Sequence, residues 1–342
     1  MPGQVLSPVR PPAPALATRQ RRERARLVVL YLLTVWVLVT LIFALPRTLP
    51  GDPLRAYVDE YTLLGPEQRE ELERAHGLDG SLLDQYGRYL SGLARGDLGQ
   101  SIALSQPVSR LLRYYLPWTL LLTGSALLVS SIAGYRLGVT AAWRRNSGTD
   151  RALQVTTTGL RAVPEYAAGT LLLIVFGVVL RLFPISEGIT PFTASEPLLE
   201  RVVDVIWHLV LPLATLSLGL LGTKVLMVRN ITVGVLGQDY MLLARAKGLP
   251  EAVQRRHHAG RNAMLPYLNL VGAQAGVAVG GGVFVQEVFG YPGVGRLMSS
   301  SVTAQDFPVI EGCFLTLSLL VLTVNLLVDL ATTVVDPRTR AR

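Results

Sequence analysis

Long apolar runs are the feature that most limits what this chain can fold into. A helix rises about 1.5 Å per residue, so about 20 apolar residues cross the hydrocarbon core of a bilayer. Lipid offers no hydrogen-bond partners, so each crossing segment must satisfy its own backbone groups, and runs of this length favour helices. The runs therefore predict an all-α integral membrane protein with about six transmembrane helices. They cover approximately 27–45, 116–143, 166–183, 205–228, 265–289 and 313–335.

Composition agrees with a chain that exposes little surface to water. Charged residues make up 16% of its 342 residues, whereas soluble domains carry about 25%. The net charge of +8 is spread over short segments between the apolar runs, which is typical of a topology signal and not of a nucleic-acid-binding surface. We therefore expect this chain to lie in the lipid bilayer and to bind no nucleic acid. Cys313 is the single cysteine, so no intrachain disulfide can form.

The connectors between the runs alternate in charge. One set is basic, and it comprises residues 1–26, 144–151, 229–264 and 337–342. The connectors between them are neutral, acidic or mixed in charge. Because cytoplasmic segments carry an excess of Lys and Arg, both termini are predicted to be cytoplasmic, which agrees with an even number of helices.

The same pattern divides the chain into segments. Residues 1–26, rich in Pro and Arg, predict a disordered basic cytoplasmic tail. The run at 27–45 predicts the first transmembrane helix; a signal peptide is the alternative, but Pro46 and Arg47 follow it instead of a small-residue cleavage site. The remaining predictions are an extracytoplasmic cap at 46–114, a transmembrane core at 115–336 with a cytoplasmic loop at 229–264, and a cytoplasmic tail at 337–342.

The loop at 229–264 holds the most informative motif, Asp239-Tyr240-Met241-Leu242-Leu243-Ala244-Arg245-Ala246-Lys247-Gly248. Strong helix formers run to Lys247, and Gly248 is typical of a helix C-terminus, so a short helix is predicted to end there. Small Ala244 and Ala246 flank the charges, as close docking of another protein requires. A solvated basic loop is the alternative.

This segment, followed by Arg261-Asn262-Ala263-Met264-Leu265-Pro266, resembles the cytoplasmic coupling loop of ABC importer permeases, in particular the dipeptide/oligopeptide/nickel branch. The resemblance covers about residues 27–340. The chain departs from the pattern at Leu242 and Leu243, where the general motif has Glu and Ala, at Gly80-Ser81, and at Glu165, where a small hydroxyl residue is usual. Further matching motifs follow in the family's order: Pro50-Gly51-Asp52-Pro53, Gly77-Leu78-Asp79, Arg95-Gly96-Asp97-Leu98-Gly99, Glu287–Gly295, Asp306–Val309 and Asn325–Asp329.

The resemblance implies one permease subunit of an ATP-driven, binding-protein-dependent importer for di- or oligopeptides in the bacterial cytoplasmic membrane. Nickel chelates or another solute stay open as cargo. The resemblance also implies a second homologous permease, two cytoplasmic ATPase subunits and an extracytoplasmic substrate-binding protein as partners. The ATPase-docking residues would be Asp239, Tyr240, Ala244, Arg245, Ala246, Lys247 and Gly248.

No catalytic, cofactor-binding or metal site is expected in this chain. A P-loop needs Lys followed by Ser or Thr, but Lys224 precedes Val225 and Lys247 precedes Gly248. ATP and Mg²⁺ would therefore be used by the partner ATPase subunits. A self-contained secondary transporter is the alternative; it would need repeat symmetry, discontinuous helices and several buried acids. A membrane-embedded enzyme would need a nucleophile or a metal cluster.

Two further patterns lie within the apolar runs. Gly272, Gly276 and Gly280 repeat every four residues, and small residues let helices approach closely in lipid. Together with Glu287 they predict a helix at a subunit interface or along the conduit, with ordinary intrachain packing as the alternative. Arg136 and Asp329 would each cost about 2.5 to 3.5 kcal/mol at a helix centre. They are predicted to form an intramembrane ion pair, with a substrate contact as the alternative.

Overall fold

The computed structural model describes residues 29, 32–44, 47–48, 67, 70–71, 74, 79–191 and 197–335, except for the side chains of 265 and 329–335. The chain divides into two units, residues 1–50 and 51–342. In the first unit, a helix covers Leu32–Ala44, inside the predicted first transmembrane helix. The predicted tails at 1–26 and 337–342, and most of the cap before residue 79, lie outside the described residues.

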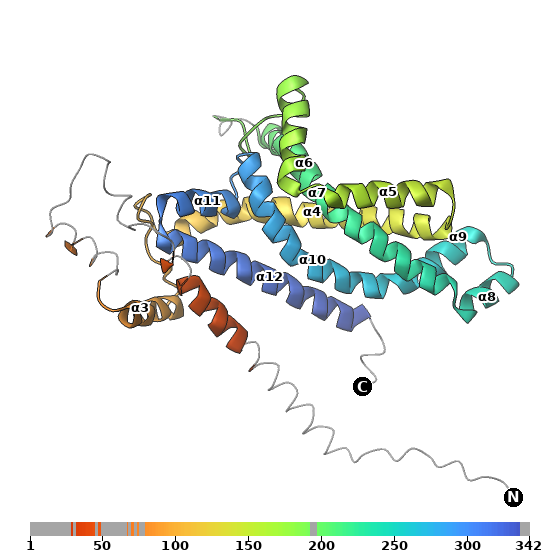
Figure 1. Cartoon of the computed structure of the whole chain (residues 1–342), viewed down its shortest axis with the longest axis horizontal. Helices are drawn as coiled ribbons and strands as arrows, with labels where there is room; N and C mark the ends of the chain where they lie inside the picture. Colours follow the sequence, from red (N-terminus) through yellow and green to blue (C-terminus); the bar gives the residue numbers. More distant parts are fainter. Residues whose placement is uncertain are drawn as a thin grey trace, which may run out of the picture. The chain divides into compact units, whose positions relative to one another are not determined.

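Every regular element described in the second unit is a helix (Figure 1). Four of these helices, α4, α7, α10 and α12, are long and apolar enough to cross a membrane, and α5 with α6–η2 forms a bent pair that counts as a fifth candidate. The structure thus confirms an all-helical membrane chain with four or five candidate spans. A sixth span would be the shorter helix Leu32–Ala44, and it stays a prediction. The elements are α3 (Leu82–Ala94), α4 (Val108–Trp143), α5 (Gly148–Ala162), α6 (Glu165–Leu172), the π-helix η2 (Leu173–Val179), α7 (Leu198–Leu236), α8 (Asp239–Ala246), α9 (Glu251–Val253), the π-helix η4 (Gln254–Gly260), α10 (Arg261–Val288), α11 (Val294–Ala304) and α12 (Phe307–Val335).

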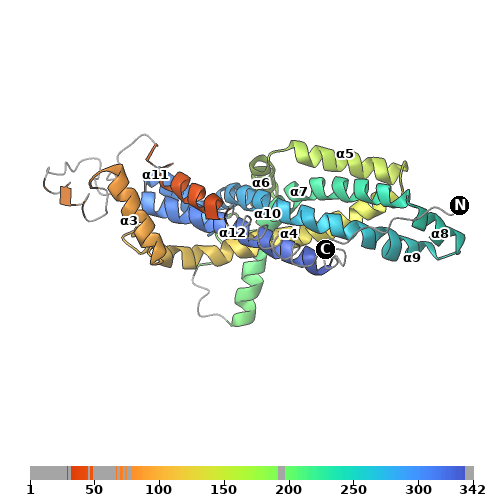
Figure 2. The ribbon, with the colours of Figure 1, turned by 90° about the horizontal axis from the view of Figure 1, so that it is seen from below.

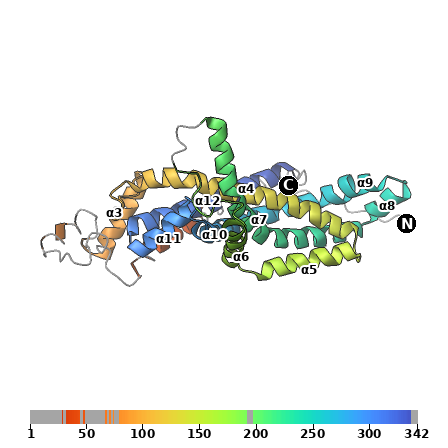
Figure 3. The same cartoon turned by 90° about the horizontal axis from the view of Figure 1, so that it is seen from above.

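Helices α4 and α7 form the most extensive helix pair of the second unit. Their backbones approach closely because a Cβ at Gly134 would lie 2.6 Å from Cβ of Lys224, and one at Gly138 would lie 2.6 Å from Cβ of Val228. Because glycine has no side chain, the backbones of the two helices lie close together at these positions. Helix α7 also contains Pro212, and its N-terminal part turns away from the other helices (Figures 2 and 3). An internal proline bends a helix because its ring removes one hydrogen bond.

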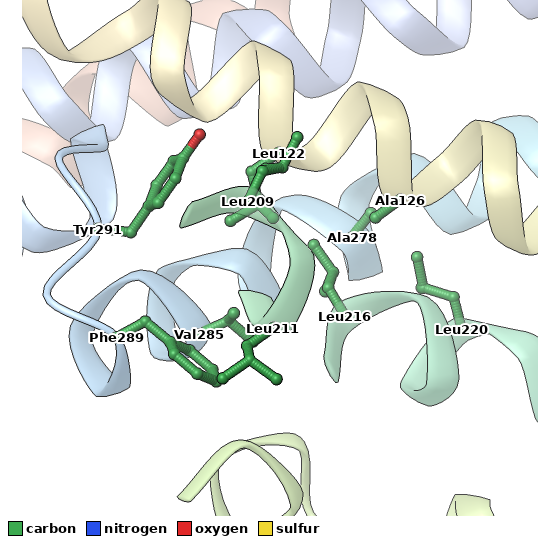
Figure 4. Packing of buried hydrophobic residues seen from close by; sticks show 10 residues of the cluster. All are labelled: Leu122, Ala126, Leu209, Leu211, Leu216, Leu220, Ala278, Val285, Phe289 and Tyr291. Atoms are coloured by element: carbon green, nitrogen blue, oxygen red, sulfur yellow. The ribbon is translucent and has the colours of Figure 1, made fainter. Parts of the chain in front are cut away.

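The main apolar core joins α4, α7 and α10. Figure 4 shows its buried side chains converging between the three ribbons, with the two aromatic rings just beyond the end of α10. The rings of Trp118 and Tyr291 also pack in a T-shaped arrangement, with centroids 5.7 Å apart. This core therefore fixes the three helices relative to one another. Its members are Leu122, Ala126, Leu209, Leu211, Leu216, Leu220, Ala278, Val285, Phe289 and Tyr291.

The third membrane passage differs from the prediction. The apolar run predicted one helix at 166–183 after a connector at 144–151, whereas α5 and α6–η2 share this stretch and meet at 98°. The break lies at Pro164, which lacks an N–H group, and the preceding Val163 is extended at φ −90° and ψ 122°. Hydropathy missed α5 because it carries charged residues, yet α5 lies alongside α7 (Figure 1).

Other helices extend beyond their apolar runs. Helices α4, α7 and α12 begin at residues 108, 198 and 307, instead of 116, 205 and 313, so the predicted cap at 46–114 overlaps the start of α4. The added turns of α4 and α12 are held by packing, since Val108, Val309 and Ile310 are buried. Helix α11 was not predicted. It packs with α4 and α12 in a second buried cluster that includes Val108, Leu297, Val309 and Cys313.

The described part of the cap is tied to α11 and α12. The hydroxyl of Ser101 donates to Asp306 Oδ2 at 2.5 Å, and the N–H of Ala103 donates to the same oxygen at 3.0 Å. Asp306 lies between α11 and α12 and is buried. Helix α3 begins with a capping box, in which the Asp84 N–H donates to the Ser81 hydroxyl oxygen and the Ser81 N–H donates to the Asp84 carboxylate. The Ser81 hydroxyl also donates to this carboxylate. These bonds hold the pKa of the Asp84 carboxyl below its ordinary value.

Candidate coupling site

The predicted short helix exists as α8. Asp239 occupies its first turn and Arg245 its last turn, which places each charge favourably in the dipole of the helix. After Ala246 the chain turns at Gly248, whose φ is +68°. The N–H of Gly248 donates to the Arg245 carbonyl at 2.9 Å, and the N–H of Leu249 donates to the Ala244 carbonyl at 3.3 Å. These two bonds form a Schellman motif, and glycine is favoured in it because it adopts this backbone without strain.

The two faces of α8 differ sharply. Met241 and Ala244 are 0% and 3% exposed, and α8 packs against η4. Ala244, one of the predicted docking residues, therefore faces the interior of this chain. The outer face instead contains Leu242 and Leu243, which are 68% and 55% exposed. The other six predicted docking residues, Asp239, Tyr240, Arg245, Ala246, Lys247 and Gly248, are all exposed.

Leu242 and Leu243 were not included among the predicted site residues. At these two positions the chain departs from the family motif, and the motif therefore assigned them no role. The available signal was an adjacent pair of leucines in a basic loop, outside every long apolar run. Two neighbouring large apolar side chains exposed at a short helix are typical of a protein-binding surface. The structure thus presents an apolar pair with Arg245 and Lys247 close by in sequence.

The glycines of α10 do not share one environment. A Cβ at Gly272 would lie 2.7 Å from Cγ1 of Val328, so Gly272 packs against α12. Gly276 makes an ordinary contact with the same helix, and Gly280 faces open space. Gly272 thus takes part in intrachain packing, whereas Gly280 lies on an open face of α10.

Gly280 belongs to an exposed stripe on α10. The side chains of Val277 and Phe284 are 56% and 60% exposed, and Ala273 and Glu287 are also exposed. The positions 273, 277, 280, 284 and 287 follow the spacing of one helix face. Two of the predicted residues, Gly280 and Glu287, thus lie on one uncovered surface.

The predicted Arg136–Asp329 pair is not tested, because the Asp329 side chain lies outside the described residues. Arg136 is exposed and lines a cavity between α4 and α10. The structure shows a different ion pair, between Asp150 of α5 and Arg229 of α7. Its two hydrogen bonds, from Arg229 Nε and Nη2 to the two carboxylate oxygens, measure 2.6 and 2.7 Å. Composition gave no signal for this pair because α5 itself was not predicted.

Two more charged side chains lie among the helices. Lys224 is fully buried, and its Nζ donates to the Leu127 carbonyl at 3.3 Å and to the hydroxyls of Ser130 and Ser131 at 2.7 and 2.9 Å. Three acceptors from α4 therefore replace the water that an ammonium group loses on burial. In the part of the chain that the structure covers, no group of three His, Cys, Asp or Glu residues is placed to hold a metal ion.

Glu165, the other charged group, begins α6 immediately after the bend at Pro164. A Cβ at Gly281 would lie 1.8 Å from Oε2 of Glu165, and one at Gly219 would lie 2.7 Å from Oε1. The absence of side chains at these two glycines on α7 and α10 therefore creates the space that the carboxylate fills. A departure from the family pattern at Glu165 is thus accommodated by the local packing.

Comparisons with known proteins agree with this architecture. Residues 134–341 match the family described as binding-protein-dependent transport system inner membrane component. A protein of Brucella ovis that is provisionally named a peptide permease is 36% identical over 88% of this chain and 93% of its own length. The dipeptide transport system permease protein DppB of Lactococcus lactis is 33% identical over 91% of this chain and 96% of its own length. The chain therefore belongs to the inner membrane components of binding-protein-dependent transport systems, and it is a multi-pass protein of the bacterial plasma membrane.

Proposed function

We propose that this chain is a permease subunit of an ATP-driven importer of di- or oligopeptides. The observation that carries the proposal is the outer face of α8, where exposed Leu242 and Leu243 lie beside basic residues in a chain of the permease family. Relatives named for peptide and dipeptide transport support peptides as the cargo class. Nickel chelates or another small solute are the second candidate cargo, carried by the same machinery.

The proposed partners follow from the family. They are a second homologous permease, two cytoplasmic ATPase subunits that use ATP and Mg²⁺, and an extracytoplasmic substrate-binding protein. The α8 face would dock into the ATPase, with Leu242 and Leu243 as apolar anchors and Arg245 and Lys247 at the rim. A buried apolar centre with a polar rim is the usual composition of a protein interface.

The packing of α8 suggests how ATPase closure would reach the membrane core. Met241 and Ala244 are buried where α8 packs on η4, and η4 in turn packs against α4, α7 and α10. A displacement of α8 would therefore push η4 against three of the candidate spans. The α10 stripe through Gly280 would face the second permease or the conduit between the two subunits.

We further propose six spans, namely the helix at 32–44, α4, α5 with α6–η2, α7, α10 and α12. Both termini and the loop at 229–264 would be cytoplasmic, and the cap at 46–107 would be extracytoplasmic. The arrangement of the second unit supports this topology, because α8 and α9 lie at one end and α3 and α11 at the other in all three views (Figures 1, 2 and 3). The basic connector between α4 and α5 lies at the α8 end (Figure 1).

The coupling role is tested with Ala246→Trp and Gly248→Val. The first adds a large side chain to the exposed α8 face, and the second places a β-branched residue at φ +68°, where only glycine is relaxed. Overfilling a close contact costs about 1 to 3 kcal/mol, so we expect about fivefold or greater loss of ATPase co-purification. Uptake of a radiolabelled dipeptide should fall with it, whereas the amount of permease in the membrane should not change.

Ala152→Trp is the matched control, because Ala152 is exposed on α5, outside α8. It should retain both the ATPase subunits and uptake. If the two α8 variants bind the ATPase subunits and transport at the original rate, the coupling role is wrong. A self-contained secondary transporter would then be favoured, with uptake that depends on a proton or sodium gradient. If the wild type takes up radioactive nickel chelates and no dipeptide, the peptide assignment alone is wrong.

A further inference from the structure

A cavity of about 760 Å³ lies between α4 and α10, beside the π-helix η4. The rings of Tyr135 and Tyr267 lie against each other in its wall, with centroids 5.9 Å apart. Tyr267 is held in place because its hydroxyl donates to the Ser131 carbonyl at 2.8 Å. Apolar side chains line much of the remaining wall, including Ile132 and Val271. The cavity therefore has a largely apolar wall, and its size is typical of a site for a small-molecule ligand.

The same cavity is strongly basic. Arg136, Arg255 and Arg256 line it, and no acidic residue is among the described lining residues. Within the described part of the chain, none of the three guanidinium groups has a carboxylate partner. The acid nearest in sequence, Glu251, accepts a hydrogen bond from Trp143.

A fourth positive charge lies behind the wall. Lys224 Nζ donates to the hydroxyl of Ser131 at 2.9 Å, and Ser131 is itself a lining residue. Unpaired positive charges around an apolar cavity favour an anionic ligand with an apolar part.

The local sequence builds the basic rim. Arg255 and Arg256 belong to η4, whose π-helical turns are wider than those of an α-helix. Gly260 lets η4 approach α4, because a Cβ at this position would lie 2.6 Å from the Tyr135 hydroxyl. The glycine thus brings both arginines to a cavity whose other walls come from the membrane helices.

We propose that this cavity binds the phosphate group and adjoining acyl chains of an anionic phospholipid from the cytoplasmic leaflet. Guanidinium groups bind phosphate oxygens through paired hydrogen bonds, and basic pockets between membrane helices on the cytoplasmic side bind acidic lipid headgroups. Tyrosines are enriched at the depth of the headgroups. The proposal goes beyond transport and uses only the proposed cytoplasmic position of η4.

Other occupants fit the charges less well. A peptide cargo also carries an ammonium group, and the described lining offers it no carboxylate. The N-terminal segment 19–26 contains five arginines and one glutamate, so it would be repelled. An ion pair between Arg136 and Asp329 would still leave Arg255 and Arg256 available.

The test is native mass spectrometry of the purified transporter complex in detergent. Wild type and R255Q/R256Q are titrated with phosphatidylglycerol and, separately, with phosphatidylcholine of the same acyl chains. Each basic residue near an anionic lipid contributes about fivefold to binding. We therefore expect the double variant to bind phosphatidylglycerol about thirtyfold more weakly, with phosphatidylcholine unaffected. R151Q is the matched control, because Arg151 is exposed and does not line the cavity.

The charge-retaining variant R255K/R256K should keep most of the phosphatidylglycerol binding, which separates loss of charge from loss of structure. Equal binding of the two lipids by the wild type would overturn the proposal, as would unchanged phosphatidylglycerol binding by R255Q/R256Q. Displacement of the lipid by millimolar inorganic phosphate would show a site for free anions and would also overturn it. ATPase subunits are counted in the same spectra, so a failure of the coupling role is seen separately.

Discussion

The Asp150–Arg229 pair gives the most direct quantitative prediction about this fold. The Asp150 side chain is 1% exposed and that of Arg229 is 14% exposed. Besides Arg229, the carboxylate accepts from Gln154 Nε2 and from the Asn146 N–H, both at 3.0 Å. Removal of either charge leaves the other buried without its partner, which costs about 3 to 5 kcal/mol in such pairs. Both Asp150→Asn and Arg229→Gln should therefore lower the free energy of unfolding by about 3 kcal/mol or more.

The double variant should lose much less than the sum of the two single losses, because it contains no unpaired charge. We expect a coupling energy of about 2 to 3 kcal/mol between Asp150 and Arg229. The measurement is equilibrium unfolding in mixed detergent and dodecyl sulfate micelles, followed by circular dichroism. Arg151→Gln, the exposed neighbour, should change the stability by less than about 0.5 kcal/mol. Single losses that add within about 0.5 kcal/mol would refute the pairing.

Two further predictions concern topology and the intramembrane charges. A cysteine introduced at position 255 should react with a membrane-impermeant maleimide only after the cells are opened, and one at position 83 should react in intact cells; labelling of position 255 in intact cells would refute the proposed topology. If Arg136 and Asp329 are paired, Arg136→Gln or Asp329→Asn alone should reduce the folded yield more than both together, since a single deletion leaves one charge in a poor solvent. Additive losses, measured by fluorescence-detected gel filtration, would contradict that pair.

The sequence predicted those parts of the fold that depend on long apolar segments. The runs at 116–143, 205–228, 265–289 and 313–335 each fall within or largely coincide with a described helix. The first turns of α4, α7 and α12 were missed, because charged residues such as Arg110, Glu200 and Glu311 interrupt the apolar runs there. Helix α5 was missed because it carries charged residues, and its place among the helices depends on contacts with α7. Gly222 permits one of these contacts, as its Cβ would lie 2.6 Å from Cγ of Arg161.

The position of the candidate site in the sequence was predictable, but the exposed face of α8 was predictable only in part. Helix formers and Gly248 were sufficient to locate α8 and its end. Which face of α8 is buried depends on η4, and a run of small residues cannot show that Ala244 packs inward and Leu242 outward. Lys224 illustrates the same limit, because its three acceptors on α4 are separated from it by more than 90 residues of sequence. Motifs therefore indicated the docking segment, and tertiary packing selected its surface.

Cys313 provides this chain with an internal reporter of its own fluctuations. Its thiol is fully buried in the cluster that joins α4, α11 and α12. A thiol reagent can reach it only when that cluster opens, so its reaction rate in excess reagent measures the opening equilibrium. The described residues contain no other thiol, and neither does the rest of the sequence. The native protein can therefore show, without any engineered label, whether nucleotide turnover loosens the helices next to the cap.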